Sequence, residues 1–209
     1  LLENRDSNKN TYYQIIDISN LSNTFHVEGH YESENYFRNF YYDLYKLFKI
    51  KKDYIDIKNK YISELSSSNS VSICVRQNRF SERINNRNSS QSLHKSSVYV
   101  DETINYINKA MNYFNKRVNN PKYLIWSNNF DNLEKYFDSK KFTFVINDND
   151  KILTDFYLLT QCKYFIVGPS TFHWWGAWLS NFDDKICVRP RDLNPSNNKN
   201  FWPEKWISI

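Results

Sequence analysis

From residue 71 to the C-terminus, short apolar runs alternate with segments of helical periodicity, and this alternation constrains the fold more than any other feature. The apolar runs have the length and the β-branched or aromatic content of strands, whereas the segments between them repeat apolar residues at helical spacing. The five strand candidates are Val71–Arg76, Tyr123–Trp126, Phe142–Ile146, Tyr164–Val167 and Lys185–Val188. Strands that alternate with helices predict a parallel sheet with both faces covered. We therefore predict an α/β fold with a Rossmann-like parallel sheet.

Four helices are expected between these strands, and their apolar residues recur every three or four positions. The helix candidates are Ile104–Val118, Phe130–Phe137, Leu153–Gln161 and Thr171–Leu179. The polar segment Gln77–Ser97, which precedes the first helix candidate, is predicted to be a loop.

The small polar run Ser66–Ser70 marks a change in pattern and predicts a linker or an exposed loop. We therefore expect part of an N-terminal α/β domain over residues 1–69 and the Rossmann-like domain over residues 70–209.

In the N-terminal part, two short strands are expected at Tyr12–Ile18 and Thr24–Val27. A helix is expected over Glu34–Phe48, because its aromatic and aliphatic residues share one broad face. Ser33 directly precedes this segment and is predicted to be its N-cap.

The charge distribution argues against a nucleic-acid-binding protein. The chain carries a net charge of +5 and 18% aromatic residues, which on their own are compatible with such a function. Lysines and acidic residues alternate, however, without a run of five like charges. A mildly basic surface suits small anionic ligands equally well, so we expect no nucleic-acid partner.

The cysteines and histidines indicate neither a disulfide framework nor a metal site. Cys74, Cys162 and Cys187 lie in or beside apolar strand candidates, which favours buried, reduced thiols. His26 and His30 are four residues apart in a segment without helical character, and no set of cysteines or carboxylates completes a site. We expect no metal ion and no cofactor.

Residues that directly follow the strands are the functional candidates, because ligands of parallel sheets bind beyond the carboxyl ends of the strands. Arg76 can hold two phosphate oxygens through its guanidinium, or pair with a surface carboxylate. Gly168 and Pro169 lead into a helix start, where Ser170 and Thr171 add hydroxyls to backbone N–H groups that attract phosphate. These hydroxyls could instead be N-caps only.

Carboxylates near the third helix candidate are a further set. Asp155, with Asp148 or Asp150 before it, could accept hydrogen bonds from the N1–H and the exocyclic amine of guanine. A carboxylate at a helix start can equally complement the helix dipole. Trp174 and Trp178 are one helical turn apart, and packing against the sheet is favoured over stacking on a sugar or base.

Several segments together resemble a known family, the α-1,2-fucosyltransferases. Cys162–Leu179 is similar to the family signature C-K-H-x-I-I-A-N-S-T-F-S-W-W-G-A-W-L, and Val71–Phe80 to its donor motif V-S-I-H-V-R-R-G-D-Y. Gly29–Phe37 resembles the G-Y-x-Q-S-E-K-Y-F segment. Trp126–Asn129 resembles the S-D-D motif, and Pro203–Ile207 the C-terminal P-x-x-W-I. The motifs occur in the family's order.

The resemblance implies a GT-B fold, GDP-fucose as donor substrate, a terminal β-galactoside of a glycan as acceptor, and inversion at the sugar carbon without a metal. By similarity, Arg76 binds the diphosphate, while Ser170 and Thr171 add phosphate contacts. Asp155 helps to recognise guanine, and Phe172 belongs to the same donor-binding set.

Some positions depart from the family pattern. The family's histidine is Cys74 here, its second arginine is Gln77, and both acids of S-D-D are replaced, by Asn128 and Asn129. Arg79 could restore the positive charge that is lost at position 77. The N-terminal segment G-G-L-G-N-Q-x-F has no counterpart, which predicts an N-terminally truncated or divergent member.

The expected reaction is inverting transfer of fucose from GDP-fucose to the 2-hydroxyl of a terminal galactose. Glu82, on the loop after Arg76, is the candidate for the general base, and Glu32 or His30 is the alternative. A second hypothesis is a catalytically inactive relative that binds a nucleotide sugar or a glycan. A third, a nucleic-acid binder, predicts a steep salt dependence of affinity.

No stretch approaches 18 consecutive apolar residues, so no membrane span is expected in this chain. The sequence begins at Leu1 rather than Met, and we expect it to be a fragment. A bacterial member would be cytoplasmic or peripherally associated with a membrane. A eukaryotic member would lie in the Golgi lumen, anchored by the missing N-terminus.

Overall fold

The computed structural model describes residues 13, 26–51, 55, 59–66, 69–82, 89–147, 152–194, 196 and 198–209. These residues form two compact units. Unit 1 comprises the described residues of 1–48 and 194–206, and unit 2 comprises those of 49–193 and 207–209. The described residues between 49 and 69 therefore belong to the same unit as the sheet. The polar run Ser66–Ser70 predicts the division between the two domains at residue 69 instead.

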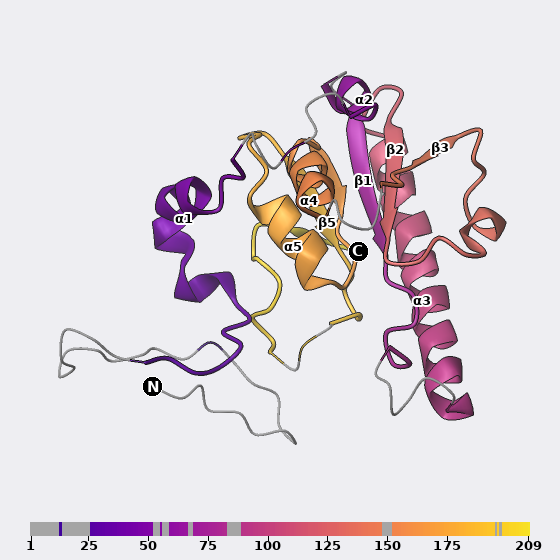
Figure 1. Cartoon of the computed structure of the whole chain (residues 1–209), viewed down its shortest axis with the longest axis horizontal. Coiled ribbons are helices and arrows are strands. Elements are labelled where there is room, and N and C mark those ends of the chain that lie inside the picture. Colours follow the sequence, from indigo (N-terminus) through magenta and orange to yellow (C-terminus); the bar gives the residue numbers. More distant parts are fainter. Residues whose placement is uncertain are drawn as a thin grey trace. The chain divides into compact units, whose positions relative to one another are not determined.

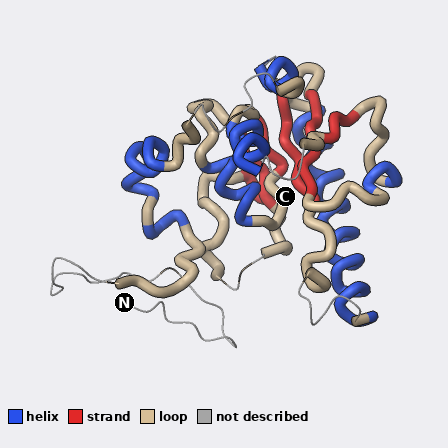
Figure 2. The backbone as a smooth tube through the Cα atoms, viewed as in Figure 1, coloured by secondary structure: helices blue, strands red, loops and turns tan. Residues whose placement is uncertain are grey.

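Unit 2 is built on a six-stranded sheet with the order β3-β2-β1-β4-β5-β6, in which all neighbouring strands are parallel. The strands are red in Figure 2. The strands are β1 Ser70–Val75, β2 Lys122–Ser127, β3 Phe142–Phe144, β4 Tyr164–Ile166, β5 Ile186–Arg189 and β6 Ile207–Ser208. This is the strand order of the Rossmann fold, with its topological switch point between β1 and β4. The predicted Rossmann-like sheet is confirmed. Strand β6 was not predicted, because two residues are too few to show a pattern.

Helices α2 Ile62–Ser66, α3 Ser90–Asn115, α4 Ile152–Thr160 and α5 Thr171–Trp178 belong to this unit. Figure 1 shows α3 on one side of the sheet and α4 with α5 on the other. Among the helices of the described ranges, none has both the length and the apolar character that crossing a membrane requires.

The long helix α3 and the segment after β2 differ from expectation. Helix α3 begins at Ser90, so the loop predicted over Gln77–Ser97 is wrong in its last part. Its first turns are polar and mostly exposed, which hid the helical pattern, and the Ser89 hydroxyl accepts a hydrogen bond from the Ser92 N–H as an N-cap. The helix expected at Phe130–Phe137 is a single 3-10 turn at Leu133–Lys135, because the preceding residue, Asn132, has a left-handed φ of 60°.

The side chains of β1 alternate between two environments, as the pleat of a strand requires. Val71, Ile73 and Val75 are buried in one cluster with apolar residues of α3. On the opposite face, the Ser72 hydroxyl lies 2.9 Å from Nε2 of His173 in α5. Strand β1 therefore joins the apolar core to the side of the sheet that carries α5.

Unit 1 contains the helical segment that follows Ser33. Instead of one helix over residues 34–48, two 3-10 turns at Glu34–Tyr36 and Arg38–Phe40 precede α1 at Tyr41–Leu47. Phe37, with φ of −143°, interrupts the helix, and the Ser33 hydroxyl caps the first turn by accepting from the Asn35 N–H. The strands expected at residues 12–18 and 24–27 lie almost entirely outside the described residues.

Gly168→Ala should destabilise the protein more than Gly176→Ala. A Cβ at position 168 would lie 2.4 Å from the Cys74 carbonyl oxygen, which cannot move without the strand. A Cβ at position 176 would lie 2.4 Å from Cδ2 of Leu159, a side-chain atom that can shift, and alanine gains about 1 kcal/mol of helix propensity over glycine. We expect Gly168→Ala to lower the free energy of unfolding in urea by about 2 kcal/mol or more. An equal loss in both variants would contradict this account.

Candidate functional site

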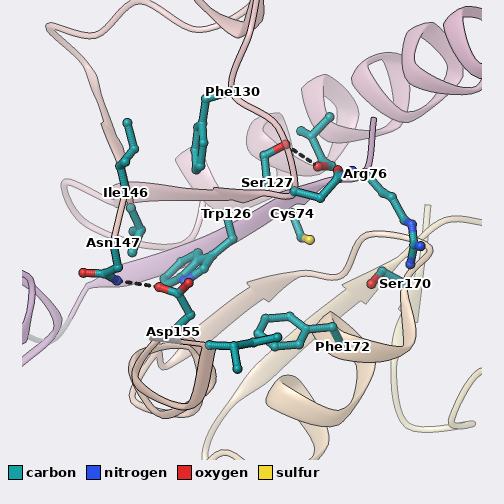
Figure 3. Close-up of a pocket in the computed structure, with 14 residues that line it drawn as sticks. Cys74, Arg76, Trp126, Ser127, Phe130, Ile146, Asn147, Asp155, Ser170 and Phe172 are labelled. Carbon is teal, nitrogen blue, oxygen red and sulfur yellow. Dashed lines mark hydrogen bonds between the residues drawn. The ribbon is translucent and has the colours of Figure 1, made fainter. Parts of the chain in front are cut away.

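A cavity of about 420 Å³ lies beyond the carboxyl ends of β1, β2 and β3, in unit 2. Its walls also include residues of α4 and of the start of α5. The lining residues that matter most for its chemistry are Arg76, Trp126, Asn147, Asp155, Ser170 and Phe172 (Figure 3). A parallel sheet binds ligands at this edge, beside the switch point of its strand order.

Arg76 directly follows β1 and reaches the cavity with its guanidinium already paired. Its Nε donates to Oε1 of Glu82 at 3.0 Å, and one terminal nitrogen donates to Oε2 at 2.6 Å. The hydrogen bonds to Glu82 raise the pKa of the guanidinium above its usual value. The carboxylate holds one edge of the planar guanidinium, which leaves the other edge to face an anionic ligand.

The loops after β1 and β2 are tied together by side-chain amides. The Gln77 N–H donates to Oδ1 of Asn128 at 2.8 Å, and Nδ2 of Asn128 donates to the Gln77 carbonyl at 3.0 Å. The Ser127 hydroxyl donates to the Val75 carbonyl at 2.8 Å. Gln77 and Asn128, two of the departures from the family pattern, therefore contact each other and fix the loop that carries Arg76.

Helix α5 presents its N-terminus to the cavity through Ser170. The Ser170 side chain does not cap its own helix, so its hydroxyl is not used there, and the residue lines the cavity. The first N–H groups of the helix and its dipole favour an anion at this position. Thr171, by contrast, is exposed and does not line the cavity.

Buried His173 holds the turn that precedes Ser170. Its Nδ1 accepts a hydrogen bond from the Gly168 N–H at 2.9 Å, which leaves Nε2 to carry the proton and donate to Ser72. Burial lowers the pKa of His173 to about 3, so the imidazole is neutral. Both ring nitrogens are thereby used to connect β1, the turn and α5.

Arg79 lies beside the same turn rather than in the cavity wall. One of its terminal nitrogens donates to the Pro169 carbonyl at 3.3 Å, and its guanidinium carbon lies 5.1 Å from the centre of the Tyr99 ring. The Tyr99 hydroxyl donates to the same carbonyl at 3.0 Å, and burial raises the pKa of this tyrosine to about 12. Arg79 places a positive charge next to the α5 turn without lining the cavity.

Asp155 lies on α4 and directs its carboxylate into the cavity (Figure 3). Its Oδ1 accepts a hydrogen bond from Nδ2 of Asn147, which follows β3. Burial raises the pKa of Asp155, and the hydrogen bond from Asn147 acts in the opposite direction. Asp148 and Asp150, the other predicted carboxylates, lie outside the described residues.

Trp126 lines the cavity, but its indole nitrogen is buried rather than exposed to it. The side chain is 3% exposed, and its Nε1 is buried without a hydrogen-bond partner among the described residues. An unpaired buried N–H costs about 1–3 kcal/mol.

The structure brings four of the predicted site residues to one cavity, namely Arg76, Asp155, Ser170 and Phe172. Glu82 reaches it only through Arg76, while Arg79 and Thr171 lie outside its wall. Trp174 and Trp178 are buried and stacked on each other, as the packing interpretation favoured. The sequence did not point to Trp126 or Asn147, although both lie at the ends of strand candidates, where the sheet-edge rule applies.

The three cysteines are buried thiols, as their apolar surroundings predicted. Cys74, Cys162 and Cys187 are all free, and burial raises the pKa of Cys74 and Cys187 to about 12. Within the described ranges, no group of three or more histidine, cysteine, aspartate or glutamate residues is arranged to hold a metal ion. In unit 1, His30 Nδ1 lies 3.6 Å from a carboxylate oxygen of Glu32.

An arginine, a helix N-terminus and a carboxylate at the switch point of a parallel sheet are typical of α/β domains that bind nucleotides. The sequence model of Glycosyl transferase family 11 matches residues 5–209. The chain belongs to this family, and the relationship predicted from the motifs is confirmed.

Two Escherichia coli proteins are similar over shorter segments. The O-antigen biosynthesis glycosyltransferase WbnK is 34% identical over 89 residues, or 41% of this chain and 30% of WbnK. The alpha-1,2-colitosyltransferase is 32% identical over 100 residues, or 44% of this chain and 33% of that protein. The matched segments thus span about a third of each relative's length. No solved structure matches the chain.

Lowering the pH from 7 to 5 should destabilise the protein through His173. The folded pKa of about 3 lies below the ordinary value of 6.5, so between these values the unfolded chain binds a proton that the folded chain does not. Stability is therefore lost as the pH falls below about 6.5, by about 1.4 kcal/mol per pH unit.

The matched variant is His173→Gln, which can accept and donate hydrogen bonds but does not titrate. We expect its free energy of unfolding in urea to fall by about 2 kcal/mol less than that of the wild type between pH 7 and pH 5. Parallel pH profiles would show that His173 is not the group responsible.

Proposed function

We propose that this protein transfers fucose from GDP-fucose to the 2-hydroxyl of a terminal β-galactoside on a glycan, with inversion at the sugar carbon. The observation that carries the proposal is the meeting of Arg76, Ser170 and Asp155 around one cavity at the switch point of the sheet. Each of the three has a partner group in a guanosine diphosphate. The GT-B fold, with an acceptor-binding domain in addition to the Rossmann-like one, is part of the same proposal.

Charge complementarity supports a diphosphate as the leaving group. Negative charge develops on the leaving diphosphate in the transition state, and preorganised donors stabilise it there. The free edge of the Arg76 guanidinium and the N–H groups at the start of α5 can supply such donors. Arg79 adds positive charge next to the same turn.

The other end of the cavity supports a guanine base. Asp155 offers carboxylate oxygens to the N1–H and the exocyclic amine, which are both donors. Phe172, which packs edge-on against Phe156 with ring centres 5.3 Å apart, adds an apolar wall.

The relatives support the linkage that we propose. The name of one of them specifies an α-1,2 transfer, and the other takes part in O-antigen biosynthesis. A glycan acceptor and a 2-hydroxyl as attacking group follow for this chain by analogy.

Glu82 is the candidate for the general base, but it can accept the proton of the acceptor hydroxyl only when its ion pair with Arg76 is weakened. Both carboxylate oxygens accept hydrogen bonds from Arg76 in the structure. A diphosphate that draws the guanidinium toward itself would weaken this pair and make the carboxylate available to the acceptor hydroxyl. The alternative is that Glu82 only orients Arg76.

Arg76→Ala should lower the transfer rate by about 10²–10³-fold, because the leaving diphosphate loses its main cationic donor. Transfer is measured with radiolabelled GDP-fucose and a β-galactoside acceptor, and circular dichroism checks the fold. The matched control is Arg117→Ala, since Arg117 is an exposed arginine near the end of α3 that packs on Tyr113. Unchanged transfer by Arg76→Ala would contradict the proposal. GDP binding by the wild type without turnover would favour a non-catalytic relative.

Glu82→Gln separates the two roles of this residue. Glutamine keeps an acceptor oxygen for Arg76 but is not a base. If Glu82 removes the acceptor proton, kcat should fall by about 10²–10⁴-fold while the KM for GDP-fucose changes little. A raised KM with most of kcat retained would instead assign Glu82 to the orientation of Arg76.

A further inference from the structure

Three side chains form a hydrogen-bonded series that ends on Asp155 at the cavity wall. Nδ2 of Asn147 donates to Oδ1 of Asp155, and Nδ2 of Asn59 donates to Oδ1 of Asn147 at 2.7 Å. The Asn59 side chain in turn accepts from the Tyr61 N–H at 3.0 Å. The series links the segment before α2, the end of β3 and helix α4. Neither asparagine was suggested by the sequence.

The direction of this series follows from its starting point. A backbone N–H can only donate, so the Tyr61 N–H requires the oxygen of Asn59 and leaves its amine to face Asn147. Asn147 must then present its oxygen to Asn59 and its amine to Asp155. The last group has to accept, which an ionised carboxylate does. Both amide orientations are therefore determined by one backbone group.

The Tyr61 side chain fixes the strand end that carries Asn147. Its hydroxyl donates to the Phe144 carbonyl at 2.9 Å and accepts from the Ile146 N–H at 3.0 Å. Tyr61 is 5% exposed, so these bonds are largely shielded from water. Asn147 is thus held on both sides, by the backbone of its own strand end and by Asn59.

We propose that Asn147 and Asn59 are positioning residues that hold Asp155 as an acceptor for the exocyclic amine of guanine, and thereby set the nucleobase specificity of the site. This inference rests on the proposed function, because it assigns the base end of the same cavity. Asn147 uses one lone pair of Asp155 Oδ1, which leaves Oδ2 and the remaining lone pair of Oδ1 for the two donors of the base.

The test compares GDP with inosine diphosphate, which lacks only the exocyclic amine. Dissociation constants for both are measured by titration calorimetry with the full chain. We expect the wild type to prefer GDP by about tenfold or more, since the amine donates to a charged acceptor. Asn147→Ala should reduce this preference to about threefold or less, with a smaller change in the affinity for inosine diphosphate.

Asn59→Asp is the second variant, because it is isosteric and keeps the acceptor for the Tyr61 N–H. It replaces the donor to Asn147 by an acceptor, which breaks the hydrogen-bonded series without removing side-chain volume. The preference for GDP should therefore fall as in Asn147→Ala. The matched control is Asn115→Ala, which removes an exposed asparagine that accepts from the Tyr123 hydroxyl, and neither residue lines the cavity. Its preference for GDP should equal that of the wild type.

The dissociation constants distinguish a failure of the positioning role from a failure of the proposed function. A preference that survives in both Asn147→Ala and Asn59→Asp would overturn the positioning role while leaving GDP binding intact. No binding of GDP by the wild type would contradict the proposed function and remove the inference with it. Arg76→Ala should weaken both nucleotides by the same factor, because the diphosphate is common to them.

Discussion

Between β1 and β4 the chain reverses the direction in which it adds strands to the sheet, and the loops that leave these two neighbours open a crevice at their carboxyl ends. Arg76 leaves β1 on one side of this crevice, and the turn at Gly168 leaves β4 on the other. The absence of a side chain at Gly168 lets that turn approach the Cys74 carbonyl. His173 then locks the turn through both ring nitrogens. Ser170, which follows this turn, lines the cavity.

Much of the fold and part of the site could be predicted from the sequence, because both follow from short-range rules. Apolar runs and helical periodicity identified five of the strands, and the sheet-edge rule selected Arg76 and Ser170 from their positions directly after strand candidates. Asp155 came from the resemblance and from the hydrogen-bonding pattern of guanine. Residues that touch a ligand lie at predictable positions of a parallel sheet.

The remaining features depend on long-range contacts that no local pattern encodes. Asn59 acts 88 positions away from its partner Asn147, and the left-handed Asn132 that limits its segment to one 3-10 turn looks like any other asparagine in the sequence. Glu82 was identified as a base from its place in the loop, but its bidentate contact with Arg76 could not be read from six residues of separation. Polar side chains that support other polar side chains are the hardest to predict.

The two faces of β1 have different neighbours, so the protein depends on the correct register of this strand. Ser72 faces the side of the sheet that carries α5, whereas Val71, Ile73 and Val75 pack in the core against α3. A slip of one position would drive Ser72 and Cys74 into the apolar layer and turn Arg76 away from the crevice. Misregistered chains would therefore expose the apolar side chains that pack against α3 and lose the geometry of the cavity at the same time.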